Sequence, residues 1–300
     1  MKHTQSLRAE YIIGATFSFL SVIATSSFPL FTEQAHLPVY TVMVWIALFM
    51  TITLSALFFL IHKGASFSIL RTGGWKLYLS GVFWGVSIVG FSLGILRDNV
   101  ALTLIGLSCT PIITSILRLI FFQKRPSFVT FLATVYIIAG ISFIFGGELS
   151  SLTLSSVLWA ISTPIFIATT LTFTWHNKEI KNTAALSIGS LIAFLLLLPI
   201  SRGNLSFQSG HLWPLIVVGS VILPFSLLMI CKATRYISST QISLILLLSP
   251  IVGMIYLWIC TNISFPADFI MGSFILLIAI IANSVYQVRL RKALEEQMEQ

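Results

Sequence analysis

The chain carries the sequence VYTVMVWIALFMTITLSALFFLI at residues 39–61. This stretch contains no Asp, Glu, Lys or Arg, and the first basic residue after it is Lys63. A bilayer whose hydrocarbon core is about 30 Å thick needs roughly 20 apolar residues per helix. Residues 39–61 are therefore long enough to cross a bilayer as one helix, which predicts a membrane protein.

Nine further apolar runs of similar length accompany this one. The ten predicted spans are residues 11–31, 39–61, 75–96, 100–122, 128–145, 154–175, 184–200, 212–231, 237–260 and 269–288. The composition agrees, because 57% of the 300 residues are hydrophobic and only 9% are charged, against about 25% charged in soluble domains. We expect an all-α integral membrane protein with ten transmembrane helices, which excludes a soluble globular enzyme.

The basic residues predict the orientation of these spans, because Lys and Arg concentrate in cytoplasmic loops. If the N-terminus is cytoplasmic, the outer segments hold only Arg97 and Arg202. The inner segments then hold Lys2, Arg8, Lys63, Arg71, Lys76, Arg118, Lys124, Arg125, Lys178, Lys181, Lys232, Arg235, Arg289, Arg291 and Lys292. Both tails are therefore predicted to be cytoplasmic. The net charge of +8 indicates topology and not a nucleic-acid partner, since the charges form no basic stripe.

A short internal similarity relates the two halves of the chain. The fourth span reads LSCTPII at residues 107–113, and the ninth reads LLLSPIV at residues 246–252. Each places a proline in mid-span after a hydroxyl residue. Since five is an odd number, a second set of five helices would enter the membrane upside down, as in many transporters. We expect two inverted five-helix repeats, at residues 1–147 and 148–288, followed by a cytoplasmic tail at residues 289–300.

These residues resemble the drug/metabolite transporter superfamily in its ten-helix EamA type. The segment ATRYISSTQIS at 233–243, continued to Ser249-Pro250-Ile251, is similar to the family's eighth-to-ninth-helix signature. The turn at 265–268 is similar to the family's closing turn, and the stretch 101–147 is similar to the first-half copy. The resemblance implies two EamA-like halves and a multi-pass carrier of the bacterial inner membrane that moves a small organic metabolite by alternating access.

The interior of the predicted spans lacks the groups that most membrane chemistry requires. All Asp and Glu residues fall in loops or tails, and the five histidines lie at span ends. A proton-coupled carrier generally needs a titrating group inside the membrane, and a membrane enzyme needs a base or metal ligands. We therefore expect exchange or facilitated transport, with no enzymatic activity, no cofactor and no metal site.

Neutral polar and aromatic residues near mid-span form the candidate substrate site. We select Trp84, Ser87, Phe91, Ser108, Thr110, Arg118, Trp159, Thr163, Gln241 and Ser249. Hydroxyl groups in membrane helices often bond to their own backbone or to a neighbouring helix, and the alternative is a hydrogen-bonding lining around a substrate. Aromatic faces attract cationic groups such as a sulfonium or a quaternary ammonium.

Two further features each have a structural and a functional interpretation. Arg118 either extends its charge to the cytoplasmic surface or holds a substrate carboxylate in a pocket or gate. Prolines lie within several spans and bend helices, and they either serve packing alone or act as hinges. The hinge candidates are Pro29, Pro111, Pro164 and Pro250.

The glycines at residues 81, 85, 90 and 94 recur in the third span. Their small-x-x-x-small spacing predicts close packing of this helix against a neighbour.

Taken together, the sequence predicts a secondary transporter whose partners are a small-molecule substrate and the lipid bilayer. The specific hypothesis is uptake of S-adenosylmethionine in exchange for S-adenosylhomocysteine, because this solute combines a cationic sulfonium with a carboxylate that Arg118 would hold. The alternatives are an exporter of amino acids or drugs and, from another class, a non-transporting membrane scaffold. The sequence is compatible with a homodimer and does not fix the oligomeric state.

Overall fold

The computed structural model describes residues 7–96, 100–123, 128–145, 154–201, 212–261 and 267–299, and all regular structure within these ranges is helical. Ten helical segments follow one another along the chain, as predicted. They are α1–α2 (Leu7–Ser26, Phe28–Glu33), α3 (Val39–His62), α5 (Gly74–Leu96), α6–α7 (Val100–Ser108, Thr110–Phe122), α8 (Phe128–Phe145), α9 (Leu154–His176), α10 (Asn182–Ile200), α11–η3–α12 (Trp213–Val217, Val218–Ile222, Leu223–Ala233), α13–α14 (Ser239–Leu246, Ser249–Thr261) and α15 (Ala267–Glu299). Two short helices, η1 (Lys63–Ala65) and α4 (Ser66–Thr72), lie between α3 and α5.

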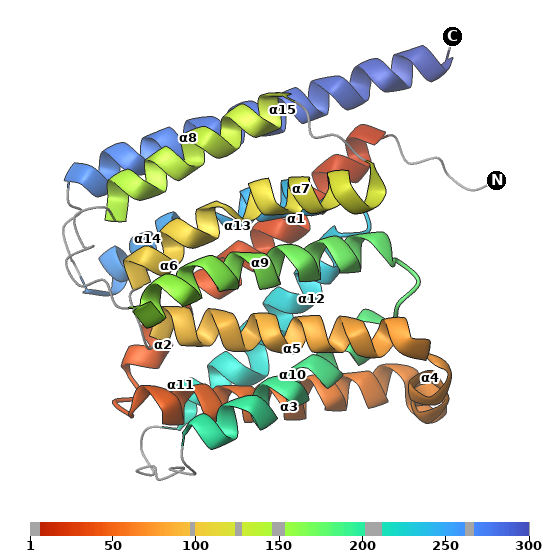
Figure 1. The fold of residues 1–300 in the computed structure, drawn as a ribbon, viewed down its shortest axis with the longest axis vertical. Coiled ribbons are helices and arrows are strands. Elements are labelled where there is room, and N and C mark those ends of the chain that lie inside the picture. The colour runs from red at the N-terminus through yellow and green to blue at the C-terminus, as the bar shows by residue number, and fades with distance from the viewer. Residues whose placement is uncertain are drawn as a thin grey trace.

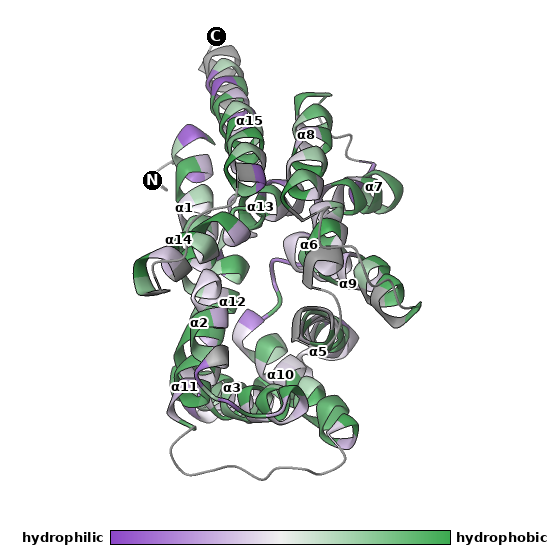
Figure 2. Cartoon of the chain, turned by 90° about the vertical axis from the view of Figure 1, so that its left-hand side faces the viewer, coloured by the Kyte–Doolittle hydropathy of each residue, from purple (hydrophilic) through white to green (hydrophobic). Residues whose placement is uncertain are grey.

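Eight of these segments are long and apolar enough to cross a membrane, within the described residues. The apolar part of α8, Phe128–Ile144, is shorter. Large apolar side chains stay exposed along the helices, including Phe121 at 68% and Ile278 at 65% exposure, and Figure 2 shows mostly hydrophobic colour along them. Hydrocarbon is the solvent that suits such surfaces. The chain is therefore a multi-pass membrane protein, which confirms the predicted all-α membrane class.

The helices lie roughly side by side in a layered bundle (Figure 1). Helix α8 packs along α15, and α10 packs between α3 and α5. Helix α9 contacts α5 on one side and the α6–α7 segment on another, while α1 contacts α12, α13 and α14. The α5–α10 contact is close because a Cβ on Gly81 would lie 2.6 Å from Ile188 Cγ2, and one on Gly85 would lie 2.8 Å from Ile192 Cγ2. The predicted glycine-mediated packing is confirmed for these two positions.

Three of the four predicted hinge prolines lie just after a helix break. Pro29 follows the break at Ser27, Pro111 follows the break at Cys109, and Pro250 follows the break between α13 and α14. A proline is tolerated in the first turn of a helix, where an N–H has no intrahelical partner. Pro164 differs, because α9 continues through it.

The described residues cover only part of the predicted boundaries between the two repeats and the tail. The boundary between residues 147 and 148 lies outside the described residues. Helix α15 continues without a break to Glu299, so the predicted tail, as far as residue 299, is a helical extension of the last segment.

Candidate functional site

A central cavity lies among helices from the N-terminal and the C-terminal half of the chain. The space open to the centres of water-sized molecules amounts to about 180 Å³. Its lining comes from α1 and α2 (Val22, Thr25, Phe28), α3 (Met50), α5 (Trp84, Ser87, Ile88, Phe91, Ser92), α6–α7 (Leu104, Leu107, Thr110), α8 (Ile141), α9 (Ile167, Thr170, Leu171), α12 (Leu223, Ser226, Leu227, Ile230) and the α13–α14 region (Ser243, Leu246, Leu247, Ser249, Pro250). One water needs only about 10–15 Å³ of such space, so the cavity has room for a small organic molecule or for several waters.

Two pairs of hydroxyl groups join helices at the wall of the cavity. Thr25 Oγ1 lies 2.5 Å from Ser226 Oγ, which links α1 to α12. Ser87 Oγ lies 2.6 Å from Thr170 Oγ1, which links α5 to α9. The Thr170 hydroxyl also contacts the Phe83 carbonyl at 2.9 Å. These hydroxyls already have protein partners, so they hold the cavity wall together.

Two other polar groups of the lining have no such partner. Trp84 Nε1 and Thr110 Oγ1 are buried and make no hydrogen bond to any described residue. Both side chains are only 4% exposed. An unpaired polar atom is costly inside a protein, and one explanation for such an atom is a water or ligand that binds there.

Half of the predicted substrate-site residues meet at this cavity. Trp84, Ser87, Phe91, Thr110 and Ser249 line it, as does the hinge candidate Pro250. The other hinge candidates, Pro29, Pro111 and Pro164, are not among its lining residues.

Three of the remaining candidates, Ser108, Thr163 and Gln241, make hydrogen bonds within the protein and are not among the described lining residues. The Ser108 hydroxyl donates to the Ile105 carbonyl at 2.5 Å, and the Thr163 hydroxyl donates to the Gly90 carbonyl at 3.1 Å across the α9–α5 contact. Gln241 Oε1 accepts from the Ser238 amide at 3.2 Å in a capping box that begins α13. Trp159 belongs to α9, but its side chain lies outside the described part of the structure.

Arg118 lies toward one end of the bundle, where α7, α9 and α13 meet. Its guanidinium carbon lies 4.5 Å from the centre of the Trp175 ring, and its Nη1 donates to Thr240 Oγ1 at 3.4 Å. Phe122, one turn further on, stacks on His176 with ring centres 3.9 Å apart. The guanidinium therefore packs on an aromatic ring and is not part of the cavity lining.

A chain of hydroxyl groups connects this end to the cavity. Ser243, a lining residue, lies 3.5 Å from the Thr114 hydroxyl. Thr114 in turn donates to Thr240 at 3.3 Å, and Thr240 is the partner of Arg118. These contacts join α7 to α13 and run from the cavity lining to Arg118.

The cavity lining itself is electrically neutral. None of the described residues that line it carries a charge, and no three His, Cys, Asp or Glu side chains gather as a metal site within the described residues. The lining thus offers aromatic faces, hydroxyl groups and one indole N–H to a ligand.

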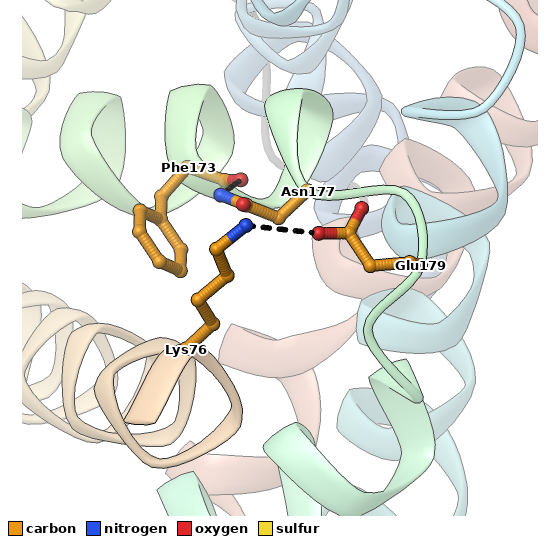
Figure 3. A network of polar contacts seen from close by, with 4 residues as sticks. All are labelled: Lys76, Phe173, Asn177 and Glu179. Carbon is orange, nitrogen blue, oxygen red and sulfur yellow. Dashed lines mark hydrogen bonds and ion pairs between the residues drawn. The ribbon is translucent and has the colours of Figure 1, made fainter. Parts of the chain in front are cut away.

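The charged contact that the described residues do form lies at the surface. Lys76 Nζ lies 3.3 Å from Glu179 Oε1, between the start of α5 and the α9–α10 connection (Figure 3). A hydrogen bond from its own backbone amide and the neighbouring Lys76 hold the pKa of Glu179 below its usual value. Both side chains are about half exposed or more, at 46% and 63%, so the pair contributes little to stability.

Ser226, Thr170 and Met50 belong to the lining but were not predicted. Ser226 could have been predicted from Ser87, because the two positions are related by a constant interval in residue number. Lining residues recur at a constant interval of 139 residues, from 84 to 223, 87 to 226, 88 to 227, 104 to 243, 107 to 246 and 110 to 249. Pro111 and Pro250, the two mid-span prolines compared in the sequence, are separated by the same interval.

Comparison with known proteins gives the fold alone. No family model matches the chain, and no curated protein matches it. Twenty-eight chains of solved structures match. One of them, described only as "Crystal structure of protein", aligns with 92% of this chain and 98% of its own length, with a TM-score of 0.76 and 10% sequence identity. The arrangement of helices therefore has a solved counterpart, and that description states no function.

Proposed function

We propose that the chain is a secondary transporter, not an enzyme, that carries a small organic solute across the bacterial inner membrane. The observation that carries this proposal is the central cavity, to which helices of both halves contribute lining residues at an interval of 139. Two halves that enclose a central site and move against each other can expose that site to each side in turn.

The helix contacts support a division into two repeats, at residues 1–147 and 148–288. If the second set of five segments repeats the first, α9 corresponds to α1 and α12 corresponds to α5. The α5–α9 contact then corresponds to the α12–α1 contact, and both are observed. The α5–α10 contact likewise corresponds to the observed contact of η3 with α3. The two hydroxyl pairs, Ser87–Thr170 and Thr25–Ser226, occupy corresponding contacts.

The orientation of the repeats follows from the charges. Lys63, Arg71 and Lys178 lie in the connections that share the cytoplasmic side if the N-terminus is inside. The structure places α4, the start of α1 and the end of α15 at one end of the bundle (Figure 1). Lys and Arg retain loops on the cytoplasmic side, so we assign this end to the cytoplasm and infer that the second repeat is inverted.

The cavity favours a carrier over a membrane scaffold, since a scaffold needs no enclosed space at the junction of its halves. At the end assigned to the cytoplasm, the contacts from Ser243 through Thr240 to Arg118 pack α7 against α13. This packing lies between the cavity and the cytoplasm, where an inner gate would be needed.

S-adenosylmethionine, exchanged for S-adenosylhomocysteine, is the solute pair that we propose to test first. Trp84, Phe28 and Phe91 offer aromatic surface to an adenine ring or a sulfonium. The uncharged lining suits exchange better than proton coupling, which needs a titrating group. Arg118, which the sequence analysis expected to hold the carboxylate of the solute, lies outside the cavity lining in this conformation. A contact between Arg118 and the solute carboxylate would therefore belong to another step of the transport cycle.

The test is uptake of labelled S-adenosylmethionine into bacteria that express the chain. We expect saturable uptake that unlabelled S-adenosylhomocysteine blocks and that a protonophore leaves unchanged. Uptake no higher than in cells with an empty vector, with the protein folded in the membrane, would refute this solute pair. Lowered accumulation of amino acids or drugs in the same cells would instead favour the exporter.

A further inference from the structure

Two sets of polar groups at the cavity differ in whether the protein already satisfies their hydrogen bonds. Ser87 and Thr170 bond to each other, and so do Thr25 and Ser226. Trp84 Nε1 and Thr110 Oγ1 are buried without a hydrogen-bond partner among the described residues. A group that is already paired gains little from a ligand, whereas an unpaired buried group recovers the hydrogen bond that it gave up on leaving water.

We infer that Trp84 Nε1 and Thr110 Oγ1 are the groups that recognise the solute, an inference that rests on the proposed transport function. The indole N–H is a donor only, and the hydroxyl can both donate and accept. The solute is therefore an organic molecule with an apolar or aromatic body that presents a hydrogen-bond acceptor, such as a ring nitrogen or a carbonyl or hydroxyl oxygen, to Trp84.

The position of Trp84 is fixed by the helix behind it. A Cβ on Gly189 of α10 would lie 2.7 Å from the Cβ of Trp84 and 2.9 Å from the Gly81 carbonyl oxygen. The α10 backbone thus comes directly against the base of the indole side chain. A donor held in this way binds its acceptor with little loss of conformational entropy.

Recognition is also asymmetric between the halves. At the interval of 139 residues, Leu223 corresponds to Trp84 and Ser249 corresponds to Thr110. Leucine has no hydrogen-bonding group in its side chain. Ser249 supplies a hydroxyl at the place of Thr110, so the halves differ here in the indole N–H alone, and the solute presents its acceptor to α5 on the side of the first half.

Two measurements test this inference, and the first needs no ligand. Thr110→Val removes the unpaired hydroxyl, and Thr170→Val removes a paired one from the same cavity. In purified protein, Thr110→Val should leave the melting temperature unchanged or raise it, and Thr170→Val should lower it. A loss for Thr110→Val as large as that for Thr170→Val would overturn the inference, because it would show that the Thr110 hydroxyl is bonded within the protein.

The second measurement is uptake of labelled S-adenosylmethionine. Trp84→Phe keeps an aromatic ring and removes the N–H, and we expect it and Thr110→Val each to reduce the initial rate at least fivefold at equal amounts of membrane protein. Trp75→Phe, at a side chain that is 68% exposed, is the matched control. Parental rates in both cavity variants would overturn the inference. If the parent protein itself shows no uptake, the proposed solute pair fails, and the comparison of melting temperatures still tests whether the Thr110 hydroxyl is unpaired, as the inference requires.

Discussion

Lys76 and Glu179 form a surface contact whose effect on stability should depend on pH. Because the folded-state pKa of Glu179 is lowered, its contribution is fully present above the ordinary value of 4.5 and is lost as the pH falls through the folded-state value. Salt screens exposed pairs, so the effect should be small and largest at low ionic strength.

We predict that Glu179→Gln removes the part of the protein's stability that depends on the ionisation of Glu179. The measurement is the melting temperature of purified parent and variant at pH 7 and near pH 4, at low salt. The two proteins should differ slightly at pH 7 and converge at the lower pH. A difference that grows on acidification would have the wrong sign for a carboxylate of lowered pKa and would contradict the assignment.

A single residue could be selected from the sequence when its residue type is unusual within an apolar span. Arg118 stands out because it is a charge inside an apolar run. Its partners could not be predicted, since Trp175 and Thr240 come from other helices, the latter 122 residues away. For the same reason the sequence could not separate the unpaired Thr110 from the paired Thr170, because both are ordinary threonines in apolar runs until the helices are packed.

At the level of helices, α6 and α9 make an unusually close contact. Gly106 of α6 lies directly against the backbone of Ala160, and a methyl group there would overlap the Ala160 carbonyl oxygen. Pro164, four residues further along α9, supplies no N–H to that carbonyl. The missing hydrogen bond leaves the carbonyl directed at the neighbouring helix, where only a glycine leaves enough room.

We predict that Gly106→Ala destabilises the protein by about 1–3 kcal/mol or more, the usual cost of overpacking, because the obstacle is backbone and cannot rotate away. The measurement is the melting temperature of purified protein. Gly64→Ala is the matched control, since a Cβ at Gly64 would meet no atom within 4 Å and should change little. Equal melting temperatures for the two variants would contradict the described α6–α9 packing.

Hydrophobicity was sufficient to predict ten helical segments, and their observed ends differ from the prediction by a few residues in most cases. The breaks were harder to predict. Proline marked the break before Pro111 and the one before Pro250, but the same residue type lies inside the continuous helix α9. Whether a proline interrupts a helix depends on how the carbonyl that has lost its N–H donor is accommodated, which is a matter of packing between helices. The π-helical turn η3 had no signal in the sequence.

For the whole molecule, the proposed orientation makes a direct prediction. In a variant whose three cysteines are replaced, a membrane-impermeant thiol reagent should label Gln34→Cys, between α2 and α3, in intact cells. It should label Gly64→Cys, between α3 and α4, only after the membrane is opened, because these sites lie at opposite ends of α3. The reverse pattern would contradict the assignment of the N-terminus to the cytoplasm.

A transporter's cavity must open to each side of the membrane in turn, and this can be tested without knowing the solute. Ser92 lines the cavity and is assigned no role in recognition. The measurement is labelling of Ser92→Cys, in the same cysteine-replaced background, by a membrane-impermeant reagent in right-side-out and in inside-out vesicles. A transporter should be labelled from both sides. Labelling from one side alone, or from neither, would contradict alternating access and favour a static scaffold.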